Sequence, residues 1–255
     1  MTERLDNPWS TRSGTSTWMT YAPDGILFPA ARLRFHDELI EAHRAASEAR
    51  TDGTLAVIVT AGPPGAGKST ALDRYPELSG YRSIDADDFK DPLLARAREE
   101  GLLEAWLGRI LQDGRPVAPR ELSNFVHAES TVIADAYRQE AFRLGENAII
   151  HGTLSYAPMI DDLLEELDGS GYERLVVVDV EVPEEQAIEQ ARARWWKERE
   201  DGSDPMGGRF VPRDAIRSYY AQDAARSISW RNARDLAERA RALDWDVRLD
   251  VIEPA

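Results

Sequence analysis

The stretch Gly62-Pro63-Pro64-Gly65-Ala66-Gly67-Lys68-Ser69 decides the fold of this chain. It matches the phosphate-binding pattern G-x-x-x-x-G-K-[ST] at every fixed position. An apolar run at 55–59 precedes the stretch, and a run compatible with a helix follows it at 69–75. This strand–loop–helix order is what a phosphate loop needs, because the backbone N–H groups of the loop and the start of the helix together bind an anion.

The positions of this loop have distinct expected roles. Gly62, Gly65 and Gly67 let the backbone approach the phosphates closely. Lys68 is predicted to neutralise the outer phosphates, and the hydroxyl of Ser69 to bind Mg²⁺. We therefore predict that the chain binds ATP or GTP together with Mg²⁺. The predicted nucleotide-binding residues are Gly62, Pro63, Pro64, Gly65, Ala66, Gly67, Lys68, Ser69 and Thr70.

The composition of the chain argues against several classes of function. Its 255 residues suffice for a full hydrophobic core, and a net charge of −15 is unlike the basic surfaces that bind nucleic acid. There is no cysteine, which excludes disulfides and thiolate chemistry. No apolar run approaches the length of a membrane span, and the first residues lack the apolar core of a signal peptide. We expect a cytoplasmic protein with no nucleic-acid or membrane partner.

Apolar patterns predict an alternation of strands and helices along the chain. The predicted strands are 55–59, 81–84, 147–150, 174–182 and 245–251, and the predicted helices are 31–50, 92–112, 122–145, 158–168, 183–199 and 231–242. This order predicts an α/β fold of the P-loop NTPase class, kinase type: a three-layer sandwich with a mostly parallel sheet flanked by helices. We expect an N-terminal helical extension at 1–53, with residues 1–30 as an irregular arm, and a P-loop kinase domain at 54–255.

An acidic cluster follows the second predicted strand and includes Asp85, Asp87 and Asp88. Because ligands of open parallel sheets bind at the carboxyl ends of the strands, we expect the cluster beside the phosphate loop. In an extended segment Asp85 and Asp87 point the same way. A carboxylate here is predicted to accept a proton from an attacking hydroxyl or to hold Mg²⁺. The alternative is that Asp87 or Asp88 only caps the next helix.

Two further segments carry polar groups suited to a substrate. His151-Gly152-Thr153 ends a predicted strand, where Gly152 allows a close backbone approach and Thr153 offers a hydroxyl. Residues 192–213 combine a helix, a Gly/Asp/Pro/Met segment and arginines, as in a lid that closes on a transferring phosphate. These arginines are Arg192, Arg194, Arg199, Arg209 and Arg213. For most of them the alternative is a solvated helix surface.

The motifs that are absent narrow the class of phosphate-loop protein. Signalling GTPases read their base with an Asn/Thr-Lys-x-Asp motif, and none of the three lysines of this chain lies in one. No transporter signature and no acidic pair typical of helicases is present. A kinase of a small molecule or a nucleotide remains.

Several motifs together resemble the zeta-toxin family, the bacterial phosphate-loop kinases of toxin–antitoxin systems. They are GPPGAGKST, IDADDF, SNFVHAES, IIHGT, ARARWW and DPMGGRFVP. The resemblance extends from about residue 54 to residue 225. The resemblance implies that ATP or GTP phosphorylates a hydroxyl of UDP-N-acetylglucosamine, a cell-wall precursor. It also implies a small helical antitoxin as a partner.

The resemblance assigns roles to single positions of this sequence. Asp87 matches the general base, and Arg194 and Arg209 match the arginines that stabilise the transferring phosphoryl group. The implied catalytic residues are Asp87, Lys68, Arg194 and Arg209, and the implied substrate-binding residues are Asp87, Glu129, His151 and Thr153. The Mg²⁺ ligand is Ser69, with Asp85 as a second candidate.

Two positions depart from the family pattern. His151 replaces the glutamate usual before Gly-Thr, and Ser155 replaces an arginine usual two residues after the threonine. Both positions face the substrate in the family, so a kinase of another small molecule, such as an antibiotic or a dinucleotide, is an alternative. A nucleotide-binding regulatory protein without phosphoryl transfer is another. The helix at 31–50 lies outside the family core, and we hypothesise that it occupies the place where a helical antitoxin binds.

Overall fold

The computed structural model describes residues 16–22, 27–49, 55–75, 78–221 and 225–253. Its internal contacts divide the chain into two compact units. The helical unit comprises 1–46, 86–136 and 193–210, and the sheet unit comprises 47–85, 137–192 and 211–255. The boundaries of these units do not coincide with the expected division into 1–53 and 54–255, and that division remains a prediction.

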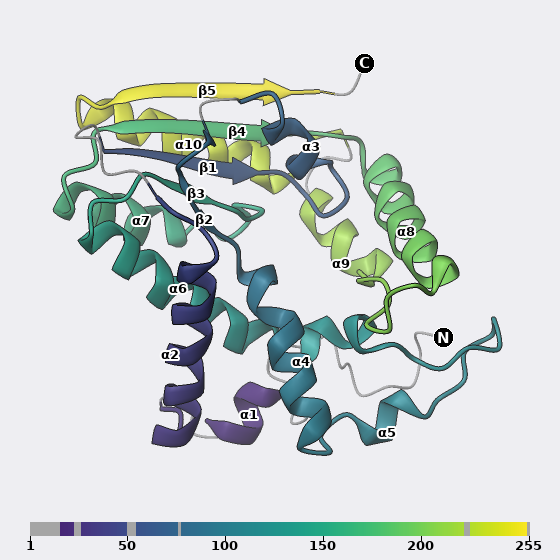
Figure 1. Ribbon diagram of the computed structural model, residues 1–255. Coiled ribbons are helices and arrows are strands. Elements are labelled where there is room, and N and C mark those ends of the chain that lie inside the picture. Colours follow the sequence, from purple (N-terminus) through teal and green to yellow (C-terminus); the bar gives the residue numbers. More distant parts are fainter. Residues whose placement is uncertain (1–15, 23–26, 50–54, 76–77, 222–224, 254–255) are drawn as a thin grey trace. The chain divides into compact units, whose positions relative to one another are not determined.

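The sheet unit is built on five parallel strands in the order β2-β3-β1-β4-β5 (Figure 1). They are β1 Ala56–Ala61, β2 Arg82–Ile84, β3 Ala148–Ile150, β4 Arg174–Val180 and β5 Asp246–Ile252. In the register of the central strands, Val57 pairs with Ala148 and with Leu175. Each strand predicted from the sequence is present, and the predicted parallel P-loop NTPase fold is confirmed.

Helices cover the sheet within this unit. They are α3 Lys68–Leu72, α7 Met159–Gly169, α9 Arg213–Arg217, η4 Ser218–Tyr220 and α10 Ile228–Ala242. Val178 and Val180 of β4 pack in one buried cluster with Leu72 and Ile216. The helix α10 lies along β4 and β5, behind the sheet in the view of Figure 1, whereas α3 lies in front of it. Since β1 is buried throughout, the phosphate loop leaves the sheet from a rigid strand.

The helical unit consists of short helices around its own buried core. They are α1 Thr17–Tyr21, α2 Ala30–Ala45, η2 Ala86–Phe89, α4 Lys90–Glu99, α5 Glu104–Leu107 and η3 Pro119–Phe125. Two longer helices, α6 His127–Arg143 and α8 Glu184–Asp201, contribute residues to both units. Leu93, Leu94, Leu103 and Val126 are fully buried in this unit. None of the helices in the described ranges is long and apolar enough to cross a membrane.

Three predictions about helices are corrected by the structure. Residues 92–112 do not form one helix, because α4 ends at Glu99 and Gly101 adopts a left-handed φ of 74° before α5 begins. The helix α2 ends at Ala45 rather than at residue 50, and Ser47 instead accepts two hydrogen bonds from Arg82 Nη1. The N-terminal arm contains the helix α1, which Ser16 caps, while residues 1–15 and 23–26 lie outside the described ranges.

Candidate active site

The phosphate loop of the sheet unit needs glycine for space as well as for backbone angle. Gly62 has a φ of 125°, and a Cβ on it would lie 2.2 Å from the carbonyl oxygen of Val180. Gly65 has a φ of 88°, and its Cβ would lie 2.3 Å from the carbonyl oxygen of Ala187. Both distances are far below any van der Waals contact, so β4 and α8 press directly on the loop backbone.

Replacing Gly65 with alanine should therefore cost more stability than replacing Gly67. Both residues have nearly the same positive φ, but a Cβ on Gly67 meets nothing within 4 Å. We expect Gly67→Ala to lower the free energy of unfolding by about 1–2 kcal/mol through its left-handed backbone. Gly65→Ala should lower it by about 1–3 kcal/mol more, since Ala187 and Ala191 have to move. Urea unfolding of both variants measures the difference, and equal losses would show that the loop is not packed as described.

Lys68 and Ser69 lie where the loop turns into α3. Lys68 Nζ donates hydrogen bonds to the carbonyl oxygens of Gly62 at 2.8 Å and Pro63 at 3.0 Å, so its charge lies over the loop. Ser69 and Thr70 are exposed in the first turn of α3. No group of three or more His, Asp and Glu side chains in the described ranges could hold a metal. The exposed hydroxyl of Ser69 nevertheless fits Mg²⁺, which takes one or two protein ligands and completes its shell with phosphate oxygens and water.

The end of β3 is tied to the phosphate loop. Gly62 N donates to the carbonyl oxygen of Thr153 at 3.2 Å. Thr153 Oγ1 lies 3.0 Å from Ser155 Oγ, and His151 Nε2 lies 3.1 Å from Ser83 Oγ in β2. The sheet unit thus brings the predicted substrate-facing side chains of His151 and Thr153 to the edge from which the loop leaves.

Asp85 lies further from the loop in the sheet than its sequence position indicated. It follows β2, and the sheet order inserts β3 between β2 and β1. The strand that leads into the acidic cluster is therefore not a direct neighbour of the loop strand, and the expected position of the cluster beside the phosphate loop stays a prediction. The chain after Asp85 is also not extended, because Ala86–Phe89 forms the 3₁₀ helix η2, so the period-two argument for Asp85 and Asp87 does not hold.

Asp87 is the centre of a charged cluster inside the helical unit. Lys90 Nζ lies 2.6 Å from Asp87 Oδ1, and Arg209 Nη1 forms an ion pair with Oδ2 of the same carboxylate. Burial by itself would raise the pKa of Asp87, but the charges of Lys90 and Arg209 outweigh it and lower the pKa to about 2. The N-cap residue of α4 is Phe89, which makes no side-chain capping bond. The alternative that Asp87 or Asp88 caps this helix stays a prediction.

Two members of this cluster escaped the sequence analysis as functional residues. Lys90 follows Asp87 at the i,i+3 spacing of a helical pair, which is the signal that could have identified it. His127 begins α6. Burial, and to a smaller extent the positive charge of Lys90, lower the pKa of its imidazole to about 4, so the side chain is neutral near pH 7. No local signal in the sequence joins His127 to Asp87.

Glu129 lies in a different environment from that expected of a substrate ligand. Its side chain is 0% exposed; Arg32 donates to both of its oxygens, at 2.5 and 3.0 Å, and His36 Nε2 lies 2.7 Å away. Burial would raise the pKa of Glu129, but the hydrogen bonds from His36 and Arg32 keep it below its usual value. In this conformation Glu129 joins α6 to α2, and its predicted contact with a substrate would compete with these bonds.

We expect Glu129→Ala to lower the free energy of unfolding by about 3–5 kcal/mol, because it leaves the buried guanidinium of Arg32 without its partner. Glu99→Ala is the matched control, since Glu99 pairs with Arg96 at the surface. That change should cost no more than about 1 kcal/mol. Urea unfolding compares the two, and a Glu129→Ala protein as stable as the control would contradict the structural role.

The arginines of residues 192–213 have different surroundings. Arg199 is buried, and it donates to Asp113 at 2.6 Å and to Glu121 at 2.9 Å, so it holds the helical unit together. Arg194 is exposed on α8. Of the five arginines expected to serve a lid, Arg209 is the one that pairs with the predicted general base.

A family model described as an AAA domain matches residues 57–206 of the chain. A search of curated proteins finds no match. Among solved structures, the AvrRxo1-ORF1:AvrRxo1-ORF2 complex with sulphate ions is similar, with a TM-score of 0.63 and 16% identity over 93% of this chain and 68% of that one. The same complex with ATP gives a TM-score of 0.63 and 16% identity over 92% and 67%.

The structure of the PezAT chromosomal toxin–antitoxin system of Streptococcus pneumoniae is also similar. It gives a TM-score of 0.57 and 13% identity over 89% of this chain and 78% of that one. The chain spans about two thirds of the length of the AvrRxo1 chains that it matches. At these identities the similarity shows a shared fold.

Proposed function

The chain belongs to the AAA-domain family, and we propose that it is a kinase that phosphorylates a hydroxyl of UDP-N-acetylglucosamine with ATP or GTP, as the toxin of a toxin–antitoxin system. The observation that carries the proposal is the ion pair between Asp87 and Arg209. A residue suited to accept a proton and one suited to neutralise a phosphate lie together although they are far apart in the sequence. A phosphate loop in the same chain supplies the features of a nucleotide site.

The proposed reaction is an in-line transfer. The acceptor oxygen forms a bond to the terminal phosphorus as the bond from that phosphorus to the bridging oxygen of ADP breaks, and Asp87 takes the hydroxyl proton. Lys68 and the loop amides hold the triphosphate, and Arg194 and Arg209 offset the developing charge. Mg²⁺ at Ser69 would add positive charge to the phosphates. An ionised Asp87 is required for this step, and the pKa of about 2 keeps it ionised at neutral pH.

The choice of acceptor and partner rests on the resemblance to the zeta toxins. The similar structures include a toxin–antitoxin system and a complex with a second chain, which supports an antitoxin as a partner for this chain. We hypothesise that α2 occupies the place where an antitoxin binds, but α2 is also bonded to the buried Glu129. Because Arg32 and His36 of α2 hold that buried carboxylate, deleting residues 1–50 is expected to impair folding as well.

A second candidate is a kinase of the same fold with another small acceptor, such as an antibiotic or a dinucleotide. Two replacements favour it, because His151 and Ser155 occupy the positions of a glutamate and an arginine in the zeta toxins. His151 contacts Ser83, and Ser155 contacts Thr153. A regulatory protein without phosphoryl transfer is less well supported, since it has no use for the Asp87 and Arg209 pair.

The proposal is tested by ADP formation with purified protein, ATP and Mg²⁺ in the presence of different acceptors. We expect UDP-N-acetylglucosamine to raise ADP formation above the rate without acceptor. Stimulation by an antibiotic or a dinucleotide alone would favour the second candidate. ATP binding without stimulation by any acceptor would favour the regulatory protein.

A further inference from the structure

Asp179 of the sheet unit is a buried carboxyl group that the proposed reaction does not use. It lies in β4 and is 0% exposed. Its neighbours Val178 and Val180 pack in one cluster with Leu72. Because successive side chains of a strand point to opposite faces, Asp179 points to the other face of the sheet, against which α10 packs. Neither of its carboxyl oxygens has a hydrogen-bond partner among the described residues. An ionised carboxylate buried in this way would be costly.

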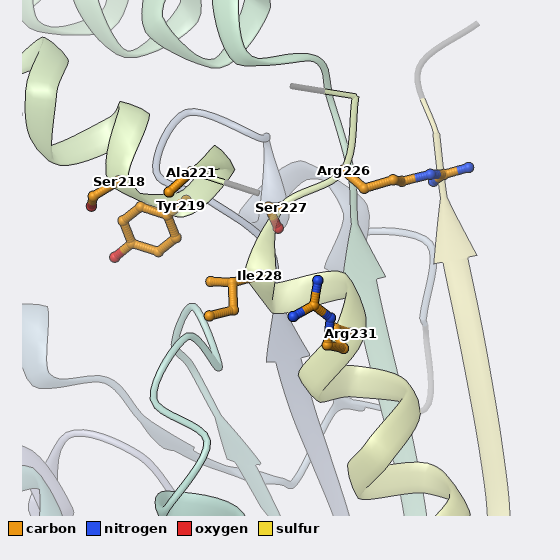
Figure 2. Close-up of a pocket in the computed structure, with 7 residues that line it drawn as sticks. All are labelled: Ser218, Tyr219, Ala221, Arg226, Ser227, Ile228 and Arg231. Carbon is orange, nitrogen blue, oxygen red and sulfur yellow. The ribbon is translucent and has the colours of Figure 1, made fainter. Parts of the chain in front are cut away.

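A second buried carboxyl group, that of Glu181, attaches the start of α10 to the chain that follows β4. Ser227 donates to the carboxylate of Glu181 through its backbone N at 2.8 Å and through its hydroxyl at 2.6 Å. Ser227 is the N-cap of α10, and its hydroxyl oxygen accepts a hydrogen bond from Ser229 N at 3.1 Å. Figure 2 shows Ser227 at the point where this helix begins.

The hydrogen bonds indicate which of the two carboxyl groups is charged. The two bonds from Ser227 stabilise the ionised form of Glu181, and the positive end of α10 acts in the same direction. Asp179 receives no such bond, and its side chain lies within hydrogen-bonding reach of Glu181. A protonated Asp179 can donate to the carboxylate of Glu181. That bond removes the repulsion between two buried negative charges.

Two arginines are the cations that act on Asp179, and both have other contacts. Arg226 pairs with Glu253, and Figure 2 shows its side chain extending away from the start of α10. Arg234 of α10 lies over the ring of Trp230, with its guanidinium carbon 4.2 Å from the ring centre. Neither arginine donates a hydrogen bond to Asp179.

The balance of these effects favours the protonated form. The strands on either side of β4 place uncharged residues opposite Asp179, which are Ala61 of β1 and Val251 of β5. Burial, and then the negative charge of Glu181, raise the pKa of Asp179 to about 7, and the positive charges of the two arginines lower it by less.

We propose that Asp179 holds a proton and donates it to Glu181, and that this shared proton fixes the start of α10 to the sheet. Loss of the proton leaves two negative charges together in the core and weakens the attachment of the helix. The inference goes beyond the proposed function, because it concerns the stability of the fold and does not depend on phosphoryl transfer.

The proton makes the stability of the fold depend on pH. The unfolded chain loses the proton of Asp179 near the ordinary value of about pH 4, whereas the folded chain keeps it up to about pH 7. The stabilisation is therefore complete below about pH 4 and is lost as the pH rises to about 7.

The test is urea unfolding of the full chain between about pH 5 and pH 8, next to the Asp179→Asn variant. Asparagine keeps the shape of the side chain and can donate to Glu181, but it has no proton to lose. Across this range we expect the unfolding constant of the unchanged protein to rise about a hundredfold relative to that of the variant. Asp246→Asn is the control, because Asp246 pairs with Arg174 at the surface, and it should follow the unchanged protein.

Carbon-13 NMR of the carboxyl groups detects the proton in the unchanged protein, whether or not the variant folds well. One resonance should titrate near pH 7 and be absent from Asp179→Asn. Glu181→Gln should move this titration to lower pH, because it removes the neighbouring negative charge.

Three results would each overturn the inference. One is a difference in stability between Asp179→Asn and the unchanged protein that is the same at every pH. Another is a spectrum in which every carboxyl group titrates in the ordinary range below about pH 5. The third is a titration near pH 7 that Glu181→Gln leaves in place.

Discussion

The Asp87→Asn variant is expected to lose phosphoryl transfer almost completely, with kcat lower by on the order of 10³-fold. Asparagine keeps the shape of the side chain but cannot accept the proton of the attacking hydroxyl. ATP binding should change little, since the predicted nucleotide-binding residues at 62–70 belong to the sheet unit and Asp87 to the helical unit. The measurement is the rate of ADP formation with saturating acceptor, together with the dissociation constant of ATP.

The neighbouring aspartates are matched controls for this prediction. Asp88→Asn changes an exposed carboxylate of the same 3₁₀ helix and should leave kcat within about threefold, as surface changes usually do. Asp85→Asn tests the second candidate for a Mg²⁺ ligand. If Asp87→Asn turns over normally while Asp85→Asn does not, the general base has been assigned to the wrong aspartate.

Arg209→Ala is expected to lower kcat by roughly 10³-fold or more, the loss seen when an arginine that stabilises a transferring phosphoryl group is removed. The same change should alter the pH dependence. Burial raises the pKa of Asp87, whereas the positive charges of Lys90 and Arg209 lower it by more. Without Arg209 the pKa rises from about 2 toward the ordinary carboxyl value, so the acid limb of kcat/KM moves to higher pH.

The pH profiles of kcat/KM for the unchanged protein and for Arg209→Ala decide this point. Arg209→Lys should keep most of the low pKa because it keeps a charge, but it should recover only part of the rate, since an ammonium lacks the planar fork of the guanidinium. Arg213→Ala is the control, because Arg213 pairs with Glu185 at the surface. An Arg209→Ala protein with a lower rate but an unmoved acid limb would show that Arg209 does not act on Asp87.

The fold could be predicted because its signals are local. The strands β1, β3 and β4 are mostly apolar, and β5 alternates apolar and charged residues. The phosphate loop is a contiguous motif whose glycines meet the backbone of β4 and α8. The prediction was wrong where a single backbone angle decided the outcome. Gly101 divides the segment 92–112 by adopting a left-handed φ, and an apolar pattern does not report that angle.

The candidate site was harder to predict, because its members meet across long stretches of sequence. Asp87 and Arg209 are 122 positions apart, and Glu129 lies 97 positions from Arg32. Their roles as candidates came from a family resemblance, which does not say what each side chain contacts. The structure shows that the two carboxylates have different surroundings. Asp87 is partly exposed and pairs with Lys90 and Arg209. Glu129 is buried and pairs with Arg32 and His36.

The most direct test of phosphoryl transfer to the proposed acceptor is the mass of UDP-N-acetylglucosamine after incubation with the full chain, ATP and Mg²⁺, next to the same reaction with Asp87→Asn. We predict that the sugar nucleotide gains one phosphate with the unchanged protein and none with the variant. An unmodified sugar nucleotide in both reactions, from a protein that still binds ATP, would contradict the proposed acceptor and make His151 and Ser155 the first positions to vary.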